Sequence, residues 1–285
     1  MSKIEKLAVP AALASLYVLS LRGRRNHPGL EELCRWRYAH RGLHNAERPE
    51  NSLAAFQAAV DGGFGAELDV HLLKDGTLAV LHDSALTRVT GQFGVVEDLT
   101  GPELKNYRLN GTEQTIPELK SVLEIFAGKA PLIIELKTYR KNHAALSAAV
   151  CEALRDYNGP YCLESFDPLC VYWLKKHRPD LIRGQLSENF ARNGSPYPLL
   201  VRCGAAQTLE NFLTEPDFIA YKFEDRRTLS NLLSRKVWGL QGVSWTLRTP
   251  RELETAEAEG WIPIFEGFVP APGRTENAGI SAEKD

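Results

Sequence analysis

The sequence predicts an α/β protein, a TIM (β/α)8 barrel with a small insertion near the barrel mouth. Three observations support this fold class. After about residue 36, short apolar runs alternate with stretches of helical pattern, which is typical of βαβ units and a parallel sheet. The chain has 285 residues, which fits one large domain. Nine apolar runs are present, and eight of them can be assigned to the strands of a barrel.

The first element is an uncharged run at residues 7–21, with Lys3 and Lys6 before it and a basic cluster at residues 22–25 after it. The run is shorter than the roughly 20 apolar residues that a membrane-spanning helix needs, and no convincing signal-peptidase site follows it. We expect residues 1–30 to be a separate apolar segment. It is a membrane anchor or interfacial helix, a helix packed on the domain, or a signal peptide. The protein is then membrane-associated through this segment or cytoplasmic, and the side of the membrane stays open.

The candidate strands follow in order along the chain. They are residues 37–42, 66–72, 77–83, 132–137, 161–166, 182–187, 218–223, 242–247 and 261–267. Asp75-Gly76, a strong two-residue hairpin signal, joins the second run to the third. The third run is therefore predicted to be a return strand outside the barrel. In the register that this turn favours, Asp69 lies opposite His82.

Helices are expected between the strands. Asn51 is predicted to cap a helix that ends at Gly62-Gly63. Thr115 and Glu118 have the spacing of a capping box, with Pro117 in the first turn of the helix that follows.

The domain boundaries follow from these elements. Residues 31–270 are expected to form the barrel domain, and residues 84–114, with one short helix at about 102–107, are the predicted insertion over the mouth. Residues 271–285 have the composition of a disordered tail.

Charge and cysteine content exclude some classes of protein. The net charge is -2 and the pI about 6.4, so a nucleic-acid partner is not expected. The five cysteines are odd in number and lack C-x-x-C spacing, which argues against a disulfide framework and a zinc site. We expect reduced thiols that lie mostly in the core.

Three acids inside apolar strands indicate a cation site. Glu67 and Asp69 are two residues apart on one strand, so their side chains share a face. Adjacent carboxylates repel each other unless a cation lies between them. Glu135 in LIIELK adds a third hard oxygen ligand, of the kind that Mg²⁺ or Ca²⁺ prefers. An acid at a strand end is often only solvated, but acids within apolar strands need a reason to be there.

Histidines and cations accompany these acids. His40 and His82 are the candidate general acid and base, since imidazole titrates near neutrality. Arg41 and Lys137 can neutralise a phosphate at the same mouth, and Trp245 offers an apolar wall.

His71 lies on the same strand face as Asp69, so a structural role is harder to assign to it than to the other histidines.

An ordered set of motifs resembles the glycerophosphodiester phosphodiesterase family over about residues 36–268. The motifs are His40-Arg41-Gly42, Pro49-Glu50-Asn51-Ser52, Glu67-Leu68-Asp69-Val70, Leu81-His82-Asp83, Leu86-Thr87-Arg88, Ile134-Glu135-Leu136-Lys137, Ser165-Phe166-Asp167-Pro168 and Trp245-Thr246. Each is weak alone, and the ordered set is specific. The sequence departs mildly at Ser52, where Thr is commoner, and at IFEGF, which lacks the usual acidic turn after the last strand.

The resemblance implies a TIM barrel that hydrolyses a glycerophosphodiester to glycerol 3-phosphate and an alcohol. It implies a divalent cation (Mg²⁺ or Ca²⁺) on Glu67, Asp69 and Glu135, with His40 and His82 as acid and base. It also implies that the substrate site is lined by Arg41, Glu50, Lys137 and Trp245. Two alternatives stay open. One is a lysophospholipase D or sphingomyelinase D-like enzyme acting on a lipid phosphodiester, and the other is an inactive barrel that serves as a binding protein.

Overall fold

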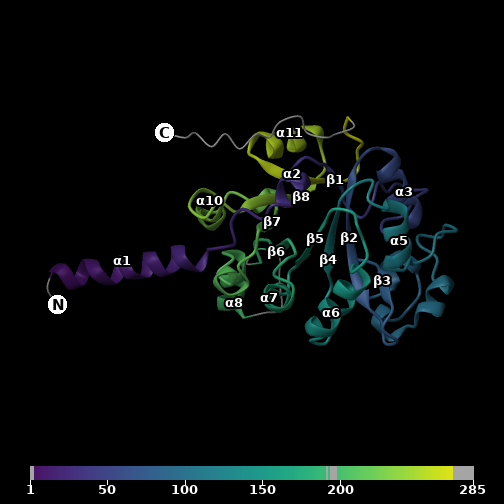
Figure 1. Cartoon of the computed structure of the whole chain (residues 1–285), viewed down its shortest axis with the longest axis horizontal. Coiled ribbons are helices and arrows are strands. Elements are labelled where there is room, and N and C mark those ends of the chain that lie inside the picture. Colours follow the sequence, from purple (N-terminus) through teal and green to yellow (C-terminus); the bar gives the residue numbers. More distant parts are fainter. Residues whose placement is uncertain (1–2, 191, 193–197, 272–285) are drawn as a thin grey trace.

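The structure is a computed structural model, and it describes residues 3–190, 192 and 198–271. The expected disordered tail thus lies outside the described residues, apart from its first residue. Eight parallel strands close into a barrel with helices around it, which confirms the predicted TIM barrel (Figure 1). The barrel strands are β1 (Tyr38–Ala39), β2 (Gly65–Leu72), β4 (Leu132–Leu136), β5 (Tyr161–Ser165), β6 (Arg183–Ser187), β7 (Phe218–Lys222), β8 (Gln241–Leu247) and β9 (Trp261–Phe265).

The barrel closes at β1, its shortest strand. Tyr38 and Ala39 pair with Gly65 and Ala66 of β2 on one side. The same two residues pair with Ile264 and Phe265 of β9 on the other. First and last strands are therefore neighbours, and the residues that follow them share one end of the barrel.

Helices surround the barrel in chain order. They are α3 (Leu53–Asp61), α5 (Leu119–Phe126), α6 (His143–Ala153), α7 (Pro168–His177), α8 (Leu199–Ala206), α9 (Asn211–Thr214), α10 (Leu229–Lys236) and α11 (Pro250–Ala258). Helix α2 (Leu30–Cys34) precedes β1, and its Leu33 belongs to the same buried core as the barrel strands.

Two predicted helix caps were wrong. Helix α3 is capped by Ser52, whose hydroxyl accepts from the Ala55 amide, while the Asn51 side chain donates to Asp69. Helix α5 begins at Leu119, later than the sequence suggested, so Pro117 lies before the helix and no side chain caps it. Arg108 and Thr115 form an isolated antiparallel bridge, which takes Thr115 out of the capping position.

The predicted hairpin register was wrong by one residue. Strand β3 (Leu78–Val80) runs antiparallel to β2, with Val70 opposite Val80, so Asp69 faces Leu81 and not His82. Leu73 and Thr77 close a turn of three residues, because the Asp75 carboxylate accepts from the amides of Thr77 and Gly101. The extra turn residue shifts the pairing by one position.

The insertion has a small apolar core of its own. It contains α4 (Thr87–Thr90), η1 (Val96–Asp98) and η2 (Gly101–Asn106), the last a 3-10 helix at the place of the expected short helix. Leu86, Val89, Val96, Leu104 and Leu109 are buried together in this second cluster. The loop that carries His82 leads directly into it.

The N-terminal helix α1 (Lys3–Ser20) projects away from the barrel, as Figure 1 shows. Within the described residues, no helix combines the length and apolar character needed to cross a bilayer. The chain then runs along the barrel, where Leu21 is buried and Arg24 binds Asp217. All five cysteines are free thiols, and Cys151, Cys162 and Cys170 are buried.

Candidate active site at the barrel mouth

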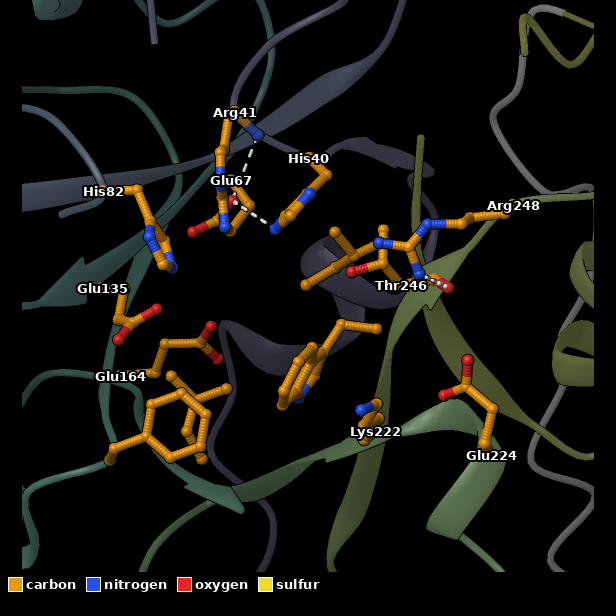
Figure 2. A pocket seen from close by; sticks show the side chains of 14 residues that line it. His40, Arg41, Glu67, His82, Glu135, Glu164, Lys222, Glu224, Thr246 and Arg248 are labelled. Atoms are coloured by element: carbon orange, nitrogen blue, oxygen red, sulfur yellow. Dashed lines mark hydrogen bonds and ion pairs between the residues drawn. The ribbon is translucent and has the colours of Figure 1, made fainter. Parts of the chain in front are cut away.

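A cavity of about 260 Å³ opens where the barrel strands end (Figure 2). Its walls come from strands β2, β4, β5, β6, β7, β8 and β9 and from the loops after β1, β3, β5, β7 and β8. The lining residues are His40, Arg41, Glu67, His82, Glu135, Glu164, Phe166, Leu186, Lys222, Glu224, Trp245, Thr246, Arg248 and Ile264. Parallel strands that end at one mouth bring together side chains far apart in sequence.

Three buried carboxylates meet at one side of this cavity. Asp69 of β2 is in register with Glu135 of β4, and Glu67 lies two residues before Asp69 on the same face. One oxygen from each of the three lies within 4.8 Å of the others. Burial raises the pKa of Glu67 well above its usual range, and the charges of Asp69 and Glu135 raise it further. The expected convergence is thus present in the structure.

Two cations offset part of this charge. Lys137 Nζ lies 2.7 Å from Glu135 Oε1 and 3.0 Å from Asp69 Oδ1. Arg41 Nε lies 3.5 Å from Asp69 Oδ2. Burial alone would raise the pKa of Asp69, but Lys137, His82 and Arg41 hold it below its ordinary value.

The carboxylates still outnumber the cations. Glu164 of β5 is in register with Glu135, and burial raises the pKa of this carboxyl well above its usual range. Its Oε2 is buried without a hydrogen-bond partner. Among the described residues, the ion pairs that Glu67, Asp69, Glu135 and Glu164 form with lysine or arginine involve Lys137 and Arg41. This donor set of hard oxygens with an excess of negative charge fits a divalent cation.

The turn after β1 carries Arg41 beside the acids. Arg41 has a φ of 54° and Gly42 one of 79°, and a side chain at Gly42 would meet Ala55 at 2.9 Å. Glycine therefore permits the close approach of this turn to α3. The Arg41 amide donates to Glu67 Oε2 at 3.1 Å, which ties the turn to the carboxylate cluster.

His40 is hydrogen-bonded by Glu266, which does not line the cavity. Its Nδ1 lies 2.5 Å from Glu266 Oε2, and its Nε2 lies 3.9 Å from Glu67 Oε2 on the cavity side (Figure 2). Burial lowers the pKa of His40, and the bond to Glu266 opposes this effect. The neutral ring is therefore favoured, with its Nδ1–H donated to Glu266 and a free lone pair on Nε2.

His82 has the same arrangement with a different carboxylate. Its Nδ1 lies 2.6 Å from Asp83 Oδ1, so Nε2 is the nitrogen left free. The pKa of His82 is lowered to about 4, mainly by burial; Lys137 and Arg41 act in the same direction, and the charge of Asp69 opposes them. Figure 2 shows Glu67 between His40 and His82, with Glu135 and Glu164 below His82. Two imidazoles with free Nε2 atoms thus border one cavity.

Glu50 does not line the cavity. Its carboxylate accepts from Arg41 at 2.9 Å and from both terminal nitrogens of Arg88, while Arg88 also binds Asp83. Glu50 therefore connects Arg41 to the Asp83–His82 pair. Asp69 and Lys137 are likewise not among the lining residues, although both contact Glu135, which is; Trp245 forms part of the wall with Phe166 edge-on at 5.7 Å.

His71 lies away from the cavity. Its Nδ1 is 2.7 Å from Glu97 Oε1 of the insertion, and its Nε2 is 3.2 Å from the backbone oxygen of His82. Ser84 also donates to Glu97. This buried group attaches the loop of His82 to strand β2.

Sequence reasoning missed Glu164 and Glu266. Glu164 lies inside the apolar run YCLES, so the rule that selected Glu135 applied to it as well. Glu266 directly follows the last strand, inside the IFEGF segment that was read as lacking an acidic turn. Its position beside His40 depends on the β1–β9 pairing, which closure of the barrel implies.

The fold and the site together define a (β/α)8-barrel protein. Its mouth brings together four acidic side chains, two histidines bound by carboxylates, and the basic side chains of Lys137 and Arg41. The family model described as the glycerophosphoryl diester phosphodiesterase family matches residues 40–269. The chain belongs to this family.

Individual relatives agree with this assignment. The Bacillus subtilis protein YhdW is 40% identical over 254 residues, 84% of this chain and 98% of its own. A glycerophosphodiester phosphodiesterase of Bacillus altitudinis is 38% identical over 42% of this chain, and the match spans 52% of that enzyme's length.

Solved structures share the fold. A phosphodiesterase of Oleispira antarctica, solved with the product sn-glycerol-3-phosphate, aligns with a TM-score of 0.67 at 23% identity, covering 81% of this chain and 92% of its own. A glycerophosphodiester phosphodiesterase of Thermotoga maritima aligns with a TM-score of 0.62 at 25% identity, covering 80% and 92%.

Proposed function

We propose that this protein hydrolyses glycerophosphodiesters to glycerol 3-phosphate and an alcohol. The observation that carries the proposal is the pair of histidines, each bound at Nδ1 by a carboxylate, that lie on either side of Glu67 of the buried acidic cluster (Figure 2). Hydrolysis of a phosphodiester needs a group that takes a proton from the attacking water and another that protonates the leaving alkoxide. Family membership and the named activity of the relatives support the same reaction.

A divalent cation, Mg²⁺ or Ca²⁺, would be held by Glu67, Asp69 and Glu135, with Glu164 near enough to bind it or to orient a ligand. When bound, it would neutralise charge on the phosphate and act as a Lewis acid. Lys137 stays charged, since its pKa is raised above the ordinary value by Asp69 and Glu135 despite burial. Together with Arg41 it holds the carboxylates in place and attracts the anionic diester.

The histidines divide the proton transfers. Their Nε2 atoms face the cavity, so one ring accepts a proton from the attacking water, and the other, which takes up a proton on Nε2 from solvent before the step, donates that proton to the departing oxygen. Glu266 and Asp83 stabilise the charge that forms on each ring. Trp245 and Phe166 provide an apolar wall for the glycerol or alcohol part.

Substitution of each histidine tests this assignment. His40→Ala and His82→Ala should each lower kcat by about 10² to 10⁴ while changing KM little. The histidine that acts as acid should matter least for a substrate releasing p-nitrophenolate, because that group leaves without protonation. The control is His177→Ala, whose ring stacks on Trp173 at the surface. Near-normal turnover of glycerophosphocholine by both single variants would rule out the mechanism.

A second substrate class is a lysophospholipid, whose phosphodiester carries one acyl chain. Relatives from rat and human, named lysophospholipase D, are 37% and 36% identical over 42% of this chain. Release of choline from lysophosphatidylcholine in preference to glycerophosphocholine would favour this class.

A further inference from the structure

Exposed apolar side chains are gathered on one side of the molecule. Among the described residues, thirteen large hydrophobic side chains are exposed, and ten of them lie on α1, α8, α9 and α10 or at the end of α10. We name these ten the apolar face: Leu13, Leu16, Leu19, Leu199, Leu200, Val201, Phe212, Leu229, Leu232 and Val237. Soluble monomers rarely expose large apolar side chains in one place.

Specific contacts join these helices at the base of α1. Tyr17 donates to Gln207, which ends α8, at 2.8 Å. Trp238, just after α10, donates to the Val18 carbonyl at 2.7 Å. Figure 1 shows α1 leaving the barrel between α8 and α10. Helix α9 also contacts α1, so the four helices that carry the exposed side chains meet around the point where α1 emerges.

The chemistry of α1 favours lipid over a protein groove. Its described residues from Pro10 to Leu16 are all exposed, so no single side of this stretch is buried against the barrel. Residues 7–21 contain no charge on any side of the helix. A helix that is apolar all round needs an apolar environment all round, which lipid tails provide. A protein groove covers only one side of a helix.

The charges around the apolar face fit an anionic surface. Residues 199–214 and 229–237 contain one acid, Glu210, and it is largely enclosed. The same segments contain Arg202, Arg235 and Lys236, while Arg22, which follows α1, is paired with Glu215 directly after α9. The neighbouring helix α11 has the opposite character, with three glutamates and no exposed large hydrophobic residue. Basic residues at the rim of an apolar surface attract anionic lipid head groups.

We propose that the apolar face binds an anionic lipid bilayer, with α1 inserted into one leaflet and α8, α9 and α10 at the interface. Helix α1 has 18 residues and so extends about 27 Å, enough to enter the leaflet on its side of a hydrocarbon core of roughly 30 Å. The face lies on the outside of the barrel, away from the cavity residues. The proposal goes beyond the hydrolysis and does not depend on it.

Flotation of the full chain with vesicles tests the proposal. The protein should float with vesicles of equimolar phosphatidylcholine and phosphatidylglycerol, and less with phosphatidylcholine alone. The double variant Leu200→Glu/Leu232→Glu leaves α1 intact and should lower affinity for the anionic vesicles about tenfold or more, because it removes apolar contact and adds negative charge. Added salt should weaken binding of the wild type.

A matched double variant provides the control. Phe93→Glu/Leu169→Glu changes two exposed apolar residues outside the face, and it should float like the wild type. All variants should hydrolyse soluble glycerophosphocholine equally, which reports on folding and separates this proposal from the proposed reaction. Equal flotation of Leu200→Glu/Leu232→Glu and wild type would overturn the proposal. So would a lipid-free dimer that this variant converts to monomer, since the face would then join two copies of the chain.

Discussion

At the scale of single residues, the site depends on groups that do not line the cavity. Glu266 binds the rear nitrogen of His40, and Asp83 does the same for His82. Asn51 has a φ of 55°, a conformation that asparagine tolerates well, and from it the side chain donates to Asp69 at 2.8 Å. Each of these residues fixes the orientation of a neighbour, so the reacting groups keep their positions before a substrate arrives.

The Glu266–His40 pair gives a prediction at this scale. Glu266→Gln keeps the shape of the side chain but removes the negative charge that stabilises a protonated His40 ring. We expect kcat to fall about ten- to a hundredfold, as for other carboxylates that orient a histidine, with little change in KM. The measurement is kcat and KM on glycerophosphocholine across pH. The control is Glu257→Gln. It removes a carboxylate of α11 that is paired with Arg37, and it should keep full activity. Equal kcat in the two variants would contradict the role of Glu266.

Some residues of this site could be predicted from the sequence, and the roles of others could not. Glu67, Asp69 and Glu135 were found because acids within apolar strands are unusual, and their convergence follows from the barrel alone. The role of Glu50 was not readable, because it depends on Arg41 in the turn after β1 and on Arg88, which the folded insertion brings to it. Side-chain partners of this kind are set by tertiary contacts, which spacing along the chain does not encode.

At the scale of elements, strands were predicted better than helix ends and turns. The apolar runs located all nine strands because burial on both sides leaves a continuous hydrophobic signal. The hairpin register failed because one carboxylate, Asp75, reorganises the turn through bonds to Thr77 and to Gly101 of the insertion. The cap at Asn51 failed because Ser52 competes for the same role one residue later.

The loop between α8 and α9, residues 207–210, gives a prediction at this scale. Glu210 lies in this loop, and burial raises its pKa to about 7 from the ordinary value of 4.5. The folded state therefore holds a proton that the unfolded state has lost between these two pH values, so the free energy of unfolding falls as pH rises through this window. Glu210→Gln cannot ionise and should be more stable than the wild type at pH 8, by about 1–3 kcal/mol.

Chemical denaturation at pH 4.5 and pH 8 measures this effect. The difference between Glu210→Gln and wild type should be larger at pH 8. Glu254→Gln, on the exposed side of α11, should show no such pH-dependent difference. A difference that is the same at both pH values would mean that Glu210 is ionised in the folded protein.

At the scale of the whole molecule, the acidic cluster links ligand binding to stability. Buried carboxylates that outnumber the nearby cations repel one another in the folded chain, and a bound divalent cation relieves this repulsion. Calcium or magnesium should therefore raise the Tm of the wild type, since a ligand that binds only the folded state stabilises it.

Thermal unfolding with and without chelator measures this stabilisation independently of activity. The rise in Tm with added cation should be largely lost in Glu67→Gln and Glu135→Gln, which should also need more cation for turnover. It should persist in His82→Ala, which keeps all three carboxylates. An equal rise in Tm in Glu67→Gln and the wild type would place the cation elsewhere.

The closure of the barrel at β1 has a consequence for the length of chain that the site requires. His40 directly follows the first barrel strand, and Glu266 directly follows the last, so the two lie together only once β9 has paired with β1. A chain that ends before residue 266 lacks this carboxylate and cannot complete the His40 site. The proposed activity should therefore require the chain through the residue that follows the final strand.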